Sequence, residues 1–71
     1  MTSEAENLDG MTDADLRAYL ATVKPRSLLS QYARTELKAR KARLAGSMTV
    51  ADGLTRRCDA LYKRLPKKDR W

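Results

Sequence analysis

The sequence predicts an all-α protein, a small three-helix domain with a long central helix and mobile tails that are acidic at the N-terminus and basic at the C-terminus. Three segments repeat their apolar residues with the period of an α-helix, and no segment alternates apolar and polar residues as a half-buried strand does. Pro25, Gly46 and Pro66 separate or end these segments, as is typical of residues where helices stop. Since the chain has 71 residues, it holds a single small domain.

The first helix is expected over residues 13–23, after an acidic tail. Residues 1–10 are polar, hold three acids and no base, and show no periodicity, so they are predicted to be flexible, with the folded domain spanning 11–66. Thr12 has the side chain of a helix N-cap, and Pro25 disfavours the α conformation in the residue before it. The apolar positions of this helix are Leu16, Tyr19, Leu20 and Val23.

The central helix is predicted to be the longest, over residues 28–44. It contains neither Gly nor Pro, it is rich in strong helix formers, and Ser27 can cap it while Gly46 suits a left-handed turn after its end. On a helical wheel it shows two apolar stripes, Leu28, Tyr32, Ala39 and Ala42 on one side and Leu29, Ala33, Leu37 and Leu44 on the other. Two stripes are typical of a helix packed on both sides.

The third helix is expected over residues 50–65, with Thr49 as its N-cap and Pro66 beyond its end. Its predicted apolar stripe consists of Val50, Leu54, Cys58, Leu61 and Leu65. A cysteine within such a stripe is interpreted as a small core residue. Residues 67–71 are predicted to form a basic tail, and the sequence leaves open whether Trp71 folds back onto the helices or anchors a partner.

Net charge points to an anionic partner. The overall charge is +6, but residues 1–10 hold only acids, and the fifteen basic and six acidic residues from Met11 onward give +9. A field of this strength on a small domain attracts nucleic acid, an acidic protein surface or an anionic lipid surface. A domain of this size also gains stability from a homodimer or a bound partner.

The sequence also indicates where the protein works. Mean hydropathy is −0.65 and no apolar run is long enough for a membrane span. A single cysteine and an N-terminus without an apolar signal segment predict a cytoplasmic protein.

A strip of the central helix is the main candidate for a binding surface. The wheel leaves exposed the residues Ser30, Arg34, Lys38, Lys41 and Ala45. No carboxylate stands at a compensating spacing among its three bases, and Glu36 is expected to pair with Arg40 instead. On the third helix, by contrast, acids precede bases by four residues at Asp52–Arg56 and Asp59–Lys63, which predicts ion pairs on an ordinary solvated face. The basic strip is therefore interpreted either as a solvated face or as a docking surface.

These features predict a non-enzymatic binding protein, regulatory or architectural, that contacts the backbone of DNA or RNA. The predicted binding residues are Arg34, Lys38 and Lys41, extended by Arg26, Arg57, Arg64, Lys67, Lys68 and Arg70. The alternative is a protein-interaction module, a small regulator or inhibitor that docks on an acidic surface of a larger complex. With no histidine, no cysteine pair and no Gly-rich phosphate loop, no catalytic, metal or cofactor site is expected.

Overall fold

The structure, a computed structural model, describes residues 7–71, so most of the predicted acidic tail lies outside the described residues. Three helices follow in chain order, α1 (Asp13–Thr22), α2 (Leu28–Leu44) and α3 (Met48–Arg64). Short 3₁₀ turns flank them, η1 (Leu8–Gly10) and η2 (Lys67–Asp69), and residues 7–71 contain no strand. The predicted all-α, three-helix fold is confirmed.

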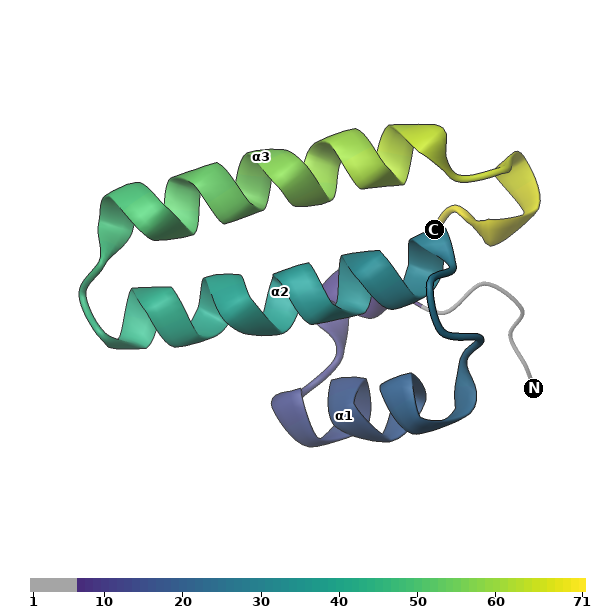
Figure 1. Ribbon diagram of the computed structural model, residues 1–71, viewed down its shortest axis with the longest axis horizontal. Helices are drawn as coiled ribbons and strands as arrows, with labels where there is room; N and C mark the ends of the chain where they lie inside the picture. The colour runs from purple at the N-terminus through teal and green to yellow at the C-terminus, as the bar shows by residue number, and fades with distance from the viewer. Residues whose placement is uncertain (1–6) are drawn as a thin grey trace.

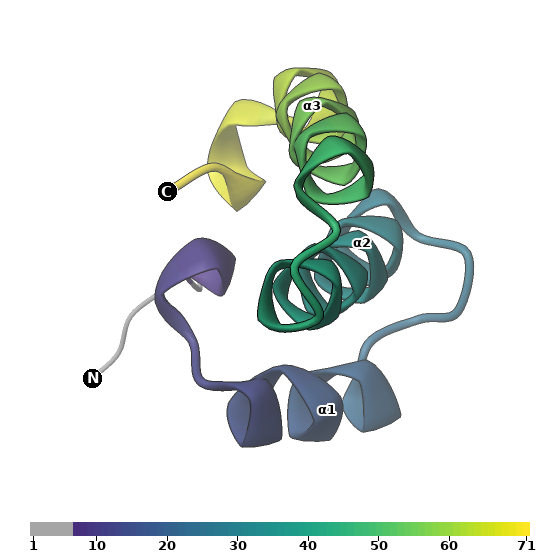
Figure 2. The ribbon, with the colours of Figure 1, turned by 90° about the vertical axis from the view of Figure 1, so that its left-hand side faces the viewer.

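The long helix α2 lies between the other two helices. α2 and α3 run antiparallel and side by side, and α1 packs against the other side of α2 (Figures 1 and 2). The core comprises Leu8, Leu16, Tyr32, Ala33, Cys58 and Leu61, so every helix contributes to it. None of the helices in the described part of the chain has the length and apolar character needed to cross a membrane.

Helix ends follow the expected local chemistry at α1 and α2. The Oγ1 atom of Thr12 accepts a hydrogen bond from the Asp15 amide at 3.1 Å, and Oγ of Ser27 accepts one from the Ser30 amide at 3.1 Å. Both predicted N-caps are therefore confirmed. Each satisfies an amide that would otherwise lack a partner in the first helical turn.

The N-terminus of α3 differs from the prediction. Gly46 adopts the left-handed conformation with φ of 81°, and the amides of Gly46 and Ser47 donate to the carbonyls of Arg43 and Ala42 at 3.0 and 2.9 Å. This pattern is a Schellman motif. Because the turn is so tight, α3 begins at Met48 with Ser47 as an N-cap that makes no side-chain bond, and the prediction of Thr49 as the cap is wrong.

At the interface between α2 and α3, buried side chains recur along α3 at spacings of three and four residues. On α3 the buried residues are Ala51, Cys58, Leu61 and Leu65, with Leu54 partly buried. Val50, expected in this stripe, is instead 56% exposed. Since only three residues join the two helices here, they lie close together, and the small Ala51 is buried in place of Val50.

The second apolar stripe of α2 is covered only in part. Ala33 is buried and Leu29 and Leu37 are partly buried, but Leu44 is 86% exposed, so its predicted place in the core is wrong. At 1.5 Å per residue, the ten residues of α1 span about 15 Å and the seventeen of α2 about 25 Å. Helix α1 is therefore too short to reach the C-terminal end of α2 (Figure 1).

Both ends of the described chain pack onto the helices, in contrast to the predicted tails. Leu8, within the expected 1–10 tail, is fully buried because η1 places it in the core. At the other end, the Trp71 ring meets the rings of Tyr32 and Tyr62 edge-on, with centroids 5.0 and 4.8 Å away. The Tyr62 hydroxyl also donates to the Trp71 carbonyl. Trp71 thus folds back onto the helices, which settles the question that the sequence left open.

Candidate anion-binding face

A groove between α2 and α3 gathers three basic side chains. Arg34 and Lys38 come from α2 and Arg57 comes from α3. The remaining lining residues are Gln31, Thr35 and Leu54, and the groove has a volume of about 250 Å³. No carboxylate of residues 7–71 lines it. The structure therefore brings together three predicted binding residues from two helices in a surface that suits an anion.

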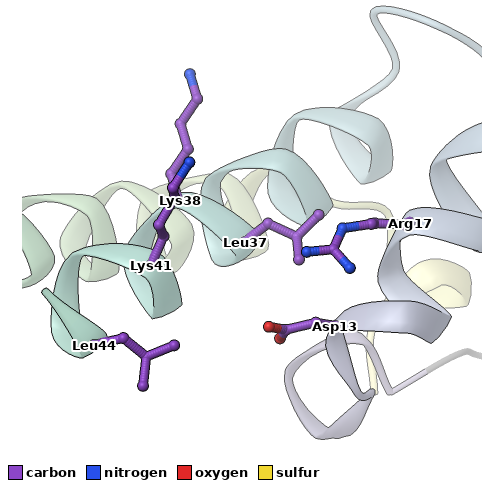
Figure 3. A pocket seen from close by; sticks show the side chains of 6 residues that line it. All are labelled: Asp13, Arg17, Leu37, Lys38, Lys41 and Leu44. Carbon is purple, nitrogen blue, oxygen red and sulfur yellow. The ribbon is translucent and has the colours of Figure 1, made fainter.

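Lys41, the third base of the predicted strip, lies outside this groove. It lines a second hollow, of about 270 Å³, together with Lys38 and with residues of α1 (Figure 3). Lys38 lines both hollows, so the basic surface continues across α2 from α3 toward α1. Arg17 of α1 also lines the second hollow. Sequence reasoning missed Arg17, because only the docking of α1 against α2 brings it near the central helix.

The remaining predicted residues divide into two groups. Arg64 follows Arg57 by two helical turns, so both lie on the same side of α3, and Arg64 is exposed. The exposed Arg26 precedes α2, and its carbonyl accepts a bond from Nε2 of Gln31 at 3.2 Å, which ties its backbone to one groove residue. Neither Arg26 nor Arg64 lines the groove itself.

The C-terminal bases do not join the groove. Lys67 and Lys68 are exposed on η2, beyond the end of α3, and line neither hollow. Arg70 donates from Nε to the Leu65 carbonyl at 3.1 Å and from Nη2 to the Lys63 carbonyl at 2.8 Å. These carbonyls belong to the C-terminal end of α3, where the last carbonyl groups have no amide donor within the helix. Arg70 therefore caps α3.

The pairing of charges corrects one expectation. Among residues 7–71, ion pairs form only at Arg40, so the predicted pairs Asp52–Arg56 and Asp59–Lys63 on α3 are wrong. Those side chains are exposed, and water solvates them at little cost. The two faces still differ, because acids alternate with bases on the outer face of α3, whereas the groove has bases alone.

Ser30 also differs from its predicted place on the exposed strip, since it is only 2% exposed. The bond that Oγ of Ser27 accepts from the Ser30 amide, and the bond that the Arg26 carbonyl accepts from Gln31, hold the preceding loop against the first turn of α2. The exposed basic strip therefore begins at Arg34.

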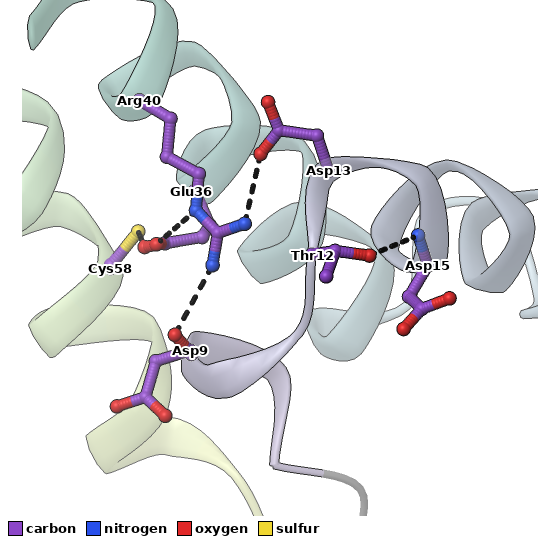
Figure 4. A network of polar contacts seen from close by, with 7 residues as sticks. All are labelled: Asp9, Thr12, Asp13, Asp15, Glu36, Arg40 and Cys58. Carbon is purple, nitrogen blue, oxygen red and sulfur yellow. Dashed lines mark hydrogen bonds and ion pairs between the residues drawn. The ribbon is translucent and has the colours of Figure 1, made fainter.

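A polar network behind the basic face holds η1, α1 and α2 together (Figure 4). The Arg40 guanidinium donates from Nε to Glu36 at 2.9 Å, from Nη1 to Asp13 at 2.9 Å and from Nη2 to the Asp9 carbonyl at 3.1 Å. The expected pairing of Glu36 with Arg40 is confirmed. Burial alone would lower the pKa of Arg40, but its hydrogen bonds to the two carboxylates outweigh burial and raise it. All three nitrogens of the Arg40 guanidinium therefore donate hydrogen bonds to groups within the domain.

Cys58 completes the network from α3. Its Sγ atom lies 3.9 Å from Oε1 of Glu36, and the residue is 2% exposed. Burial, followed by the nearby Glu36 carboxylate, raises the pKa of the Cys58 thiol to about 12. The thiol is therefore protonated and buried, as expected of a core cysteine rather than a nucleophile.

The shifted thiol predicts a loss of stability in alkali. An unfolded thiol ionises near its ordinary pKa of 9.0, whereas the folded one keeps its proton to about pH 12. Its contribution to stability is therefore complete below pH 9.0 and is lost as the pH rises toward 12, at up to about 1.4 kcal/mol per pH unit. Burial also raises the pKa of Tyr32, which steepens the loss further.

The measurement is urea unfolding across this pH window for the wild-type protein and for Cys58→Ala. We expect a shallower decline in the free energy of unfolding for the variant, because only the thiol differs between the two proteins. If the free energy of unfolding falls with pH in parallel for the two proteins, the folded protein does not hold the thiol proton.

Comparison of the chain with protein-family models, with curated proteins and with solved structures found no match. The described face offers cationic side chains that are carried on helices α2 and α3.

Proposed function

We propose that the protein is a small non-enzymatic binding protein that contacts the phosphate backbone of nucleic acid, with a regulatory or architectural role. The observation that supports this most is the groove between α2 and α3, where Arg34, Lys38 and Arg57 meet without a carboxylate. None of these three side chains forms an ion pair with residues 7–71. A bound phosphate would therefore replace only water and counterions.

Backbone contacts suit this fold better than reading of bases. Sequence-specific reading of the major groove relies on base-contacting side chains of one recognition helix, whereas the three cations of the groove come from two helices, α2 and α3. Stacking on single-stranded bases needs free aromatic rings, and Tyr32, Tyr62 and Trp71 are engaged with one another. Phosphate contacts position the protein without sequence selectivity and are available on both DNA and RNA.

The test is a pair of double variants that remove equal charge. Arg34→Gln with Arg57→Gln removes two bases from the groove, and the control, Arg56→Gln with Lys63→Gln, removes two from the outer face of α3. We expect only the groove double variant to bind labelled duplex DNA and RNA more weakly than the wild-type protein does. The slope of log affinity against log salt should fall by about one unit for each base removed.

Two outcomes would contradict the proposal. Equal losses from both double variants would mean that net charge, and no particular site, attracts nucleic acid. Absence of salt-dependent binding by the wild-type protein would leave the groove to an acidic protein partner, for which losses concentrate at one or two desolvated side chains.

A further inference from the structure

The C-terminal half of α2 has an uncovered apolar surface on the side that α1 covers elsewhere. Leu37 and Leu44 line the second hollow with Asp13, Arg17, Lys38 and Lys41 (Figure 3). Leu44 is the most exposed of the large apolar residues in the described chain. An apolar patch rimmed by polar groups is typical of a protein interaction site.

The rim of this hollow is positive. Its one carboxylate, Asp13, is neutralised by Arg40 at 2.9 Å. Arg17, Lys38 and Lys41 form no ion pair with residues 7–71. The hollow therefore combines an apolar floor with three cations that form no ion pair within residues 7–71, which is complementary to a segment bearing both apolar and acidic side chains.

The hollow is open and lies between α1 and the C-terminal half of α2. Leu44, which lines it, is exposed to solvent. The hollow begins at the N-terminal end of α1, where a longer α1 would have continued along α2 (Figure 1). A second helix lying end to end with α1 would cover Leu37 and Leu44.

We propose that this hollow binds an acidic amphipathic helix of a partner protein. Apolar side chains of that helix pack on Leu37 and Leu44, in the helix-in-groove mode. Its carboxylates pair with Arg17 and, at the edge of the hollow, with Lys38 and Lys41, whose ammonium groups extend away from Leu44 (Figure 3). Nucleic acid fits less well, because a leucine floor offers phosphate no hydrogen bond. A second copy of this chain also fits less well, because two domains of the same strong positive charge repel each other.

This hollow is a separate site from the proposed nucleic-acid groove, and Lys38 is the one lining residue that the two have in common. The probe is a fluorescein-labelled helical peptide with leucines at i, i+3 and i+7 and glutamates at the flanking positions. A matched peptide keeps the glutamates and replaces the leucines with alanine. Fluorescence anisotropy with the full-length protein should show saturable binding of the leucine peptide and at least roughly tenfold weaker binding of the alanine peptide.

The variant that tests the floor is Leu44→Ser, which keeps the charge and, being at an exposed position, should keep the fold. We expect it to weaken binding of the leucine peptide roughly tenfold, whereas the control Val50→Ser, at an exposed apolar residue outside the hollow, should leave binding unchanged. Lys41→Gln should weaken binding and reduce its salt dependence. Binding of duplex DNA should be the same for Leu44→Ser and the wild type.

Several results would overturn the inference. The first is that the wild-type protein fails to show saturable binding of the leucine peptide, and the second is that the two peptides bind equally well. The third such result is that Leu44→Ser binds the leucine peptide with the affinity of the wild-type protein. Loss of DNA binding in Leu44→Ser would assign the hollow to nucleic acid. A dimer of the wild-type protein that dissociates in this variant would assign it to self-association.

Discussion

Replacing Leu16 with alanine is expected to destabilise the domain by about 2–5 kcal/mol, the range for deleting a fully buried leucine. Leu16 is 0% exposed and is one of the two largest fully buried side chains in residues 7–71. It joins α1 to a core that also contains residues of η1, α2 and α3. A domain this small has only roughly 3–5 kcal/mol from its core, so the variant should be largely unfolded at room temperature.

The matched control for Leu16 is Leu44→Ala, the same chemical change at a side chain that is 86% exposed. Its stability should stay within about 0.5 kcal/mol of the wild type, as is usual for surface substitutions. Urea unfolding followed by circular dichroism measures both variants. Similar losses at the two positions would show that α1 does not pack as described.

Arg40→Met is expected to cost about 3 kcal/mol, because the change removes the one cation that three acceptors share. The Glu36 side chain is 13% exposed and would lose its 2.9 Å contact while remaining beside Cys58. The Asp9 carbonyl would lose its bond to Nη2, which weakens the attachment of η1 to α2. Methionine retains most of the aliphatic stem, so the loss reports mainly on polar contacts.

The control on the same helix is Arg43→Met. The Arg43 guanidinium makes one bond, from Nη2 to Oγ1 of Thr55 at 2.7 Å, in exposed surroundings. We expect a loss of no more than about 1 kcal/mol there. Adding Glu36→Gln to Arg40→Met should recover part of the stability, because an unpaired amide is cheaper to bury than an unpaired carboxylate. A fully additive double variant would indicate that Glu36 and Arg40 are not coupled.

Helix positions were predictable because their causes are local. The range 28–44 agrees with α2, and Ser27 and Gly46 act at its ends as their side chains indicate. Where neighbouring structure overrides local chemistry, prediction was wrong. The tight turn at Gly46 starts α3 before Thr49, and the close approach of the helices places Ala51 inside rather than Val50.

The candidate site was predictable in composition but not in arrangement. A helical wheel shows that Arg34 and Lys38 share a face of α2, because their spacing alone determines it. Nothing in the wheel places Arg57 across a groove from them, or places Arg17 on the same hollow as Lys41. Those neighbours depend on how the helices pack, which is a relation between distant segments.

Sequence alone therefore determined the fold class, the central helix and the positive charge of its exposed strip, since these depend on residue spacing within a few turns. Tertiary structure decided which apolar residues remain uncovered, because the length of α1 relative to α2 leaves Leu44 exposed. It also decided the roles of the ends. Leu8 and Trp71 belong to segments without helical periodicity, and they are ordered only through contacts with the assembled core.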